Sequence, residues 1–151
     1  LFSRITDRHG PAIRDRKITV EVSVKPPDLT VLGDGQRLEQ AVQNLAANAL
    51  RHTPEGGRLS LSAEDVAEGT RISVRDTGPG IPAEHLPHVF ERFYKADAAR
   101  SATRMSGSGL GLSIVQAIVE RHGGTVTATN APDGGALFEI RIPRPDHPRS
   151  E

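Results

Sequence analysis

Apolar residues recur along the chain with two different periods, and each period predicts a different kind of element. Alternation at every second position predicts a set of strands, at residues 17–24, 59–63, 72–74, 125–129 and 136–142, with a further short strand at 30–32. In the first of these strands the apolar residues share one face and predict that this face is buried: Ile18, Val20, Val22 and Val24.

Apolar residues at helical spacing predict two long helices. The first follows Asp34, a residue that suits the N-cap position, and runs to about Arg51 with a core stripe of Leu38, Val42, Leu45 and Ala49. The second runs from Leu110 to His122 and ends at the glycine pair that follows.

Helices and strands are mixed in this order, and several strands are joined by hairpins. We therefore expect an α/β sandwich (α+β), in which a mixed β-sheet of about five strands is covered on one face by about three helices. One domain should span residues 15–144, after a linker at residues 1–14 and before a proline-rich tail at residues 145–151. The pattern of the linker favours a helix only weakly, and His9-Gly10-Pro11 should interrupt any helix there.

The composition narrows the possible functions. Of the 151 residues 36% are hydrophobic and only 3% aromatic, so Val, Ile, Leu and Ala must supply most of the core. The 19 basic residues balance 19 acidic ones, which argues against a broad nucleic-acid interface. The absence of cysteine excludes disulfides and thiolate metal sites, and no apolar run approaches the roughly 18 residues of a membrane span. Since the first residue is leucine, we expect a fragment of a longer protein.

The first predicted helix carries two asparagines on one face. At about 100° per residue, Asn44, Asn48 and Arg51 form a stripe beside the apolar stripe, with His52 at its margin. Asparagine is a poor helix former, so two asparagines on one helical face need an explanation other than helix stability. One interpretation is a metal–phosphate site, because an amide oxygen suits Mg²⁺ and a guanidinium suits phosphate. The other is a polar helix face without a ligand.

Asp76 stands at the end of a predicted strand, before the glycine-containing run Thr77-Gly78-Pro79-Gly80-Ile81. Glycines let the backbone approach a ligand closely. A buried carboxylate here can accept a hydrogen bond from the exocyclic amine of adenine, whereas guanine presents a carbonyl at that place. The alternative is an ordinary turn of aspartate and glycine.

From residue 77 to residue 108 apolar residues show no regular spacing that would predict a long helix or strand. Connections of this length in compact domains usually serve as lids or binding loops. Glycines then open the second predicted helix, where free N–H groups favour anions, in the run Gly107-Ser108-Gly109-Leu110-Gly111-Leu112. This run has neither the Gly-Lys pair of a Walker loop nor the spacing of a dinucleotide fingerprint.

An aromatic segment lies inside the long connection, Phe90-Glu91-Arg92-Phe93-Tyr94-Lys95. It can anchor the connection to the core, and it also offers Arg92 and Lys95 as cations for phosphate.

The order of these motifs resembles the N, G1, F and G2 boxes of sensor histidine kinases, within an ATPase superfamily that includes DNA gyrase, MutL-type repair proteins and heat-shock chaperones. The resemblance covers roughly residues 14–143, and its Phe-x-Arg-Phe phrase points to kinases. It implies a Bergerat ATP-binding fold with a long ATP lid. It also implies the ATP-binding catalytic domain of a two-component sensor histidine kinase, with ATP and Mg²⁺ as cofactors.

The resemblance assigns roles by motif position. Asn48 would be the Mg²⁺ ligand and Asn44 its companion, Arg51 would meet the phosphates, and His52 would pack near the nucleotide. Asp76 would bind the adenine amine. The residues that approach the nucleotide would be Gly78, Gly80, Ile81, Gly107, Ser108, Gly109, Leu110, Gly111 and Leu112.

Lys95 and Arg92 would lie at the base of the lid, and we expect Asn44 and Arg92 to serve catalysis. In gyrase-like relatives a glutamate one turn before the metal-binding asparagine activates water, and Asn44 holds that place here. A neutral amide cannot act as a general base at pH 7. We therefore expect phosphoryl transfer, with a nucleotide-gated ATPase, a serine kinase of the same superfamily or a non-enzymatic ATP-binding regulatory module as alternatives.

The acceptor histidine is missing, because no histidine of this chain is followed by an acidic residue as in the family's acceptor motif. The resemblance implies that residues 1–14 lead from a separate dimerisation and phosphoacceptor domain of the same parent. A response regulator would act downstream. The fragment should be monomeric and cytoplasmic, the parent a homodimer anchored in the bacterial cell membrane.

Overall fold

The computed structural model describes the chain except residues 28, 30, 32, 92–110, 133 and 144–151. Its helices are α1 (Phe2–Arg8), α2 (Gly10–Asp15), α3 (Gly35–His52) and α5 (Gly111–Arg121), with a short 3-10 helix η1 (Leu86–His88). Its strands are β1 (Thr19–Lys25), β2 (Arg58–Val66), β3 (Gly69–Asp76), β4 (Thr125–Asn130) and β5 (Ala136–Pro143).

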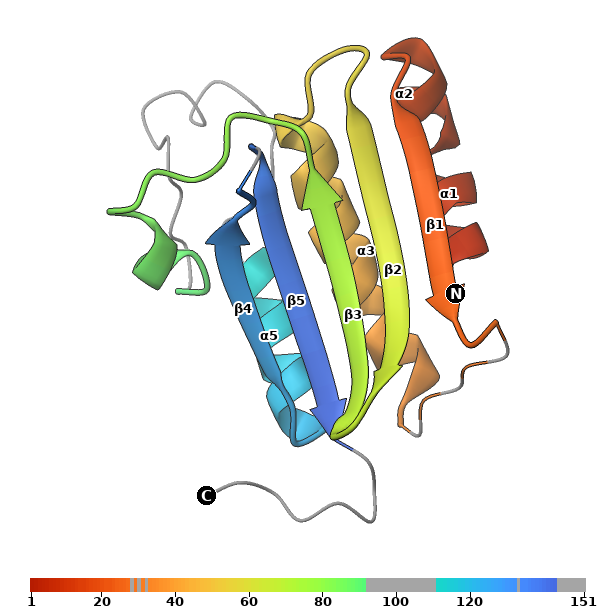
Figure 1. The fold of residues 1–151 in the computed structure, drawn as a ribbon, viewed down its shortest axis with the longest axis vertical. Helices are drawn as coiled ribbons and strands as arrows, with labels where there is room; N and C mark the ends of the chain where they lie inside the picture. Colours follow the sequence, from red (N-terminus) through yellow and green to blue (C-terminus); the bar gives the residue numbers. More distant parts are fainter. Residues whose placement is uncertain (28, 30, 32, 92–110, 133, 144–151) are drawn as a thin grey trace.

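The five strands form one mixed sheet in the order β1-β2-β3-β5-β4. β1 pairs parallel with β2, while the other three pairs are antiparallel. Figure 1 shows α3 and α5 behind the sheet, with α1 and α2 beside its β1 edge. The predicted α/β sandwich is confirmed, with four α-helices in the described part of the chain.

The core lies between the sheet and the two long helices. The apolar stripe of α3, which includes Val42 and Leu45, is fully buried, as is Val115 of α5. These residues form one cluster with the inward-facing residues of the central strands, among them Val74 and Ile140. The predicted helix at residues 34–51 and its core face are therefore confirmed, and so is the N-cap, since the Asp34 carboxylate accepts a hydrogen bond from the Arg37 amide at 3.2 Å.

The first strand is less buried than predicted. Ile18 is buried just before β1, but Val22 is 51% exposed, so the prediction that Val22 lies in the core is wrong. β1 is an edge strand, and α3 packs against β2 and β3. An alternating pattern shows which face of a strand is apolar, but the helices decide how much of that face is covered.

Residues 1–15 form two helices that meet at His9, at the interruption that the sequence predicts. Phe2 and Ile5 are buried in the main core cluster. Arg4 Nε also donates to Glu39 Oε1 of α3 at 2.7 Å. These contacts tie α1 to the domain, while the assignment of residues 1–14 to a linker stays a prediction.

The remaining predicted elements agree with the structure wherever it describes them. Thr30 and Leu32 lie outside the described residues, and Val31 between them is not in a strand. None of the helices in the described ranges is both long and apolar enough to cross a membrane.

Candidate functional site

Asp76, the last residue of β3, is 1% exposed. Its Oδ1 accepts hydrogen bonds from the backbone N–H groups of Gly78 at 2.8 Å and Ala136 at 3.3 Å. Both bonds use the same oxygen, so Oδ2 receives no hydrogen bond from the part of the chain that the structure describes. A carboxylate oxygen accepts hydrogen bonds and can take one from a ligand. The arrangement therefore leaves Asp76 as an acceptor for a donor from outside the chain.

The loop after β3 touches the last turn of α3. At Gly78 a Cβ atom would overlap the backbone carbonyl of His52, so glycine is required for this close approach. The same end of α3 is held by Arg16, whose guanidinium donates to the carbonyls of Leu50 and Thr53. The contact places Asp76 beside the helix that carries the asparagines.

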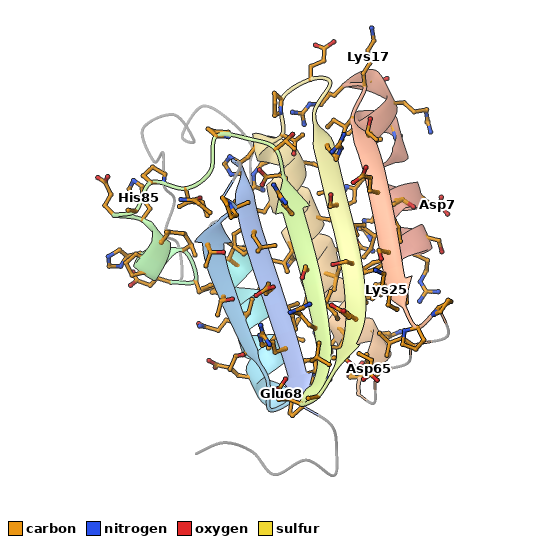
Figure 2. All side chains as sticks on the ribbon, in the orientation of Figure 1. Asp7, Lys17, Lys25, Asp65, Glu68 and His85 are labelled. Atoms are coloured by element: carbon orange, nitrogen blue, oxygen red, sulfur yellow. The ribbon has the colours of Figure 1, made fainter. Side chains whose placement is uncertain are left out.

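Figure 2 shows the opposite end of the sheet, where the hairpin between β2 and β3 is marked by Asp65 and Glu68. Because β3 runs from this hairpin to Asp76, the predicted site lies at the other end of the strand.

Asn48 and Arg51 lie about one turn apart near the end of α3, as the helical stripe predicts. Arg51 Nη2 donates to Asn48 Oδ1 at 3.0 Å. An amide oxygen has two lone pairs, so Oδ1 keeps one for a second partner such as a hard cation. Within the described ranges no group of three or more His, Cys, Asp or Glu side chains could hold a metal. A cation beside Asn48 would therefore complete its shell with phosphate oxygens and water.

Asn44 connects the asparagine helix to the start of α5. Its Nδ2 donates to the carbonyl oxygen of Gly111 at 3.3 Å, across 67 residues of sequence. Leu112, the next residue, is half-buried and packs on the core. Two motifs that are far apart in the chain thus meet, while the roles assigned to their residues stay predictions.

Sequence reasoning missed Asn130, the last residue of β4, which holds the loop after β3. Its Oδ1 accepts from the Ile81 amide at 2.7 Å, and its Nδ2 donates to the Ile81 carbonyl at 2.7 Å. The same oxygen lies close to Gly80. These residues are 49 positions apart, so no local pattern could indicate the pairing. In the sequence Asn130 only marks the end of a strand.

The aromatic segment is described at its beginning. Val89 is buried, and the ring of Phe90 meets that of Phe138 on β5 edge to face, with centroids 6.1 Å apart. This packing supports the interpretation of a hydrophobic anchor. The remaining predicted site residues of this connection lie outside the described residues: Arg92, Lys95, Gly107, Ser108, Gly109 and Leu110.

A polar groove of about 540 Å³ lies between α1 and α3, lined by Arg4, Arg8, Gln36, Glu39, Gln40, Gln43 and Asn44. It contains Asn44 but neither Asp76 nor Asn48. Of the predicted site residues that the structure describes, only Asn44 therefore lines this groove.

The chain is similar in sequence to known ATP-binding proteins. Residues 33–146 match the model of the family described as histidine kinase-, DNA gyrase B-, and HSP90-like ATPase. The chain is 48% identical over 118 residues to the signal transduction histidine-protein kinase AfsQ2 of Streptomyces coelicolor, an alignment that covers 78% of this chain and 21% of that protein. The chain spans less than a third of the length of such relatives: 21% of AfsQ2 and 31% of the signal transduction histidine-protein kinase/phosphatase MprB of Mycolicibacterium smegmatis.

Solved structures share the fold. The catalytic domain of histidine kinase ThkA, in a nucleotide-free form, superimposes with a TM-score of 0.81 at 32% identity, covering 93% of this chain and 90% of that one. ThkA has also been solved in complex with the response regulator protein TrrA. Full-length ShkA in complex with AMPPNP gives a TM-score of 0.78 at 32% identity, covering 91% of this chain and 28% of that chain.

Proposed function

Since the chain belongs to the histidine kinase-, DNA gyrase B- and HSP90-like ATPases, we propose that it binds ATP with Mg²⁺ and transfers the γ-phosphoryl group to a histidine on a separate domain. The chain is an ATP-binding catalytic domain of the sensor histidine kinase type, by family match, identity and fold. The metal, the acceptor and the transfer reaction belong to the proposal.

The observation that carries the proposal is the buried Asp76 carboxylate, with one oxygen held by two backbone amides and the other open to an outside donor. The exocyclic amine of adenine is such a donor. Guanine would place a carbonyl against the carboxylate and leave two acceptors facing each other. The site therefore selects adenine.

The phosphates would lie along α3, between Asn48 and the start of α5. The free lone pair of Asn48 Oδ1 fits Mg²⁺, which would neutralise phosphate charge when bound. Arg51, hydrogen-bonded to the same amide, carries a positive charge for phosphate oxygens, and His52 would pack near the nucleotide. The N–H groups around Gly111, at the helix N-terminus, would donate hydrogen bonds to phosphate oxygens.

We assign the loop residues outside the described ranges by motif position alone. Gly107, Ser108, Gly109 and Leu110 would approach the phosphates together with Leu112, while Arg92 and Lys95 would reach them from the base of the lid. Gly80 and Ile81 would shape the wall beside the base, where Asn130 holds Ile81 by two hydrogen bonds.

Asn44 decides between transfer and hydrolysis. Its amide nitrogen is engaged with the Gly111 carbonyl, and a neutral amide cannot take a proton from water at pH 7. Phosphoryl transfer to an imidazole nitrogen needs little activation of the nucleophile, so positioning and charge neutralisation carry most of the catalysis. Asn44 would help to position the reacting groups without removing a proton.

The partner would be a dimerisation and phosphoacceptor domain of the same parent, since no histidine here stands in the family's acceptor motif. A response regulator would receive the phosphoryl group next. The parent would be a homodimer at the bacterial cell membrane, with this domain on the cytoplasmic side.

Binding and transfer test the proposal separately. Calorimetric titration of the 151-residue chain should give a dissociation constant in the micromolar range for ATP with Mg²⁺, and at least about tenfold weaker binding of GTP. Asn48→Ala should weaken the Mg²⁺-dependent part of ATP binding about tenfold. Gln40→Ala removes an amide from the same helix and should leave the affinity unchanged.

Transfer requires the acceptor domain of the parent. With labelled ATP, that domain should acquire an acid-labile, alkali-stable phosphoryl group only when this chain is present. An acid-stable product would identify a serine kinase, and rapid steady-state phosphate release by the chain alone would identify a hydrolase. Failure of ATP to bind would reject the whole proposal.

A further inference from the structure

His122 joins the end of α5 to the beginning of α3. Its Nε2 accepts a hydrogen bond from the backbone N–H of Asp34 at 3.0 Å, and its Nδ1 lies 2.9 Å from the carbonyl oxygen of Ile118. A backbone N–H can only donate, so Nε2 must be unprotonated, and a carbonyl can only accept, so Nδ1 must carry the proton. The two partners therefore assign a neutral imidazole with a defined tautomer.

The backbone opposite the ring makes room for it. A Cβ atom at Gly33 would lie 2.6 Å from His122 Cδ2 and 2.8 Å from Nε2. Real side chains do not approach so closely, so alanine at Gly33 would push the ring away from Asp34. The Gly33 backbone and the His122 ring are thus matched in shape, although Asp34 and His122 are 88 positions apart in the sequence.

A second hydrogen bond between side chain and backbone also links α3 to α5. In this bond Asn44 Nδ2 donates to the Gly111 carbonyl, at 3.3 Å. Along α3 the two links are about 15 Å apart at the usual helical rise, and along α5 nearly the same distance. The helices are therefore antiparallel and are linked at the start and in the middle of α3, so α5 cannot slide along α3 without breaking both links.

We propose that His122 is a positioning residue that holds α5 in register with α3, and thereby keeps the Gly111 end of α5 in place for the nucleotide phosphates. This inference rests on the proposed function, because the two helices are its phosphate-binding walls. If the register is not held, only a fraction of the molecules present a competent site, and the apparent affinity falls by that fraction.

Two amide side chains separate the cross-helix bond from the local one. His122→Gln carries an acceptor at the distance of Nε2 and can still bond to Asp34. His122→Asn carries a donor near the place of Nδ1, keeps the bond to Ile118 and cannot reach Asp34. Both variants lose the imidazole ring and keep a neutral amide, and they differ in length by one methylene.

The experiment is calorimetric titration of the 151-residue chain and its variants with AMP-PNP and Mg²⁺, at a temperature where circular dichroism shows each to be folded. Loss of one hydrogen bond of ordinary strength predicts that His122→Asn weakens binding about three- to tenfold. His122→Gln should stay within about twofold of the unchanged chain. Gly33→Ala, which keeps His122 but displaces its ring, should behave like His122→Asn.

Nitrogen NMR of the unchanged chain gives an independent readout, since Nε2 should resonate as an unprotonated acceptor and Nδ1 as a protonated nitrogen. Equal affinities in all variants, or equal losses for the asparagine and glutamine variants, would overturn the inference, because a purely structural histidine predicts one of these results. Protonation of Nε2 in the folded chain would overturn it too. If the unchanged chain does not bind the nucleotide, the proposed function itself fails.

Discussion

Asp34 and Asp76 lie at opposite ends of α3 and use the same carboxylate in different ways. Asp34 is exposed, and its Oδ1 accepts from the Arg37 amide at the helix N-terminus. Asp76 is 1% exposed, and its Oδ1 accepts from the amides of Gly78 and Ala136. The exposed carboxylate stabilises a helix. The buried one holds the loop after β3 through Oδ1, and its second oxygen can accept a hydrogen bond from a ligand.

The glycines at the two ends differ in the same way. A Cβ at Gly35 would meet nothing within 4 Å, while a Cβ at Gly78 would overlap the His52 backbone. One end of α3 is therefore open to substitution, and the other end depends on a close fit between backbones. The difference agrees with the proposed nucleotide site near Asp76 and with a role in helix stability for the end near Asp34, and three predictions test this contrast.

The largest expected effect is on adenine binding. Asp76→Asn should weaken ATP binding at least about hundredfold, because the amide turns an NH₂ group toward the adenine amine. Asp34→Asn should leave ATP binding unchanged, since asparagine caps a helix equally well. Calorimetric titration measures both. Equal affinities for the two variants would contradict the distinction between the ends.

Gly78→Ala should come next, because the new methyl group must push the loop after β3 away from the last turn of α3. We expect a loss of about 1–3 kcal/mol in unfolding free energy, as in other overpacked sites, together with weaker ATP binding. Gly35→Ala, in open space at the first turn of the same helix, should be neutral or slightly stabilising. Urea denaturation gives the stabilities, and a neutral Gly78→Ala would show that the backbones are not closely fitted.

Asp34→Ala should cost about 1 kcal/mol of stability, the usual effect of losing an N-cap side chain. The backbone N–H of Asp34 remains, so its bond to His122 should persist and ATP affinity should change less than twofold. Chemical denaturation and titration of the same preparation measure the two quantities. A large loss of affinity with unchanged stability would reverse the assignment of this end.

The smallest effect concerns His9, which lies between α1 and α2 and belongs to neither end of α3 in the chain. Burial, and then the neighbouring Arg8 charge, lower its pKa below the ordinary value of 6.5. The unfolded chain therefore binds more protons than the folded chain between the folded pKa and 6.5. Stability from this group is complete above that window and decreases as the pH falls through it.

His9→Gln should remove this part of the pH dependence without changing ATP affinity. Urea midpoints at about pH 7.5 and 5.5 provide the measurement. If the difference between the two midpoints is the same in the variant and the unchanged chain, His9 is not the titrating group.

Much of the fold follows from local pattern. The apolar stripe of α3 and the alternation of apolar residues in β2, β3 and β5 predict these elements clearly. In each of them one face is turned to the core and the other to the surface. β1 was the exception, since its Val22 is exposed at the edge of the sheet. The burial of Phe2 and Ile5 was not predicted either, because a short polar helix shows no core face until its neighbour is known.

The motif residues of the candidate site could be predicted from the sequence, but the residues that hold the surrounding loop and helix end could not. Asn44, Asn48 and Asp76 stand out because asparagine is rare inside helices and a carboxylate before glycines is suited to close approach. Asn130 and Arg16 hold the surrounding loop and helix end, and no local sequence pattern distinguishes them.

The sequence by itself determined the elements, the apolar faces and the chemistry of the motif residues, because these depend on neighbours a few positions away. Only the tertiary structure decided that the described residues donate to Asp76 through Oδ1 alone, that Asn44 meets Gly111, and that His122 reaches Asp34. These contacts join residues separated by tens of positions. Their geometry depends on how α3, α5 and the sheet pack together, and no local pattern contains that information.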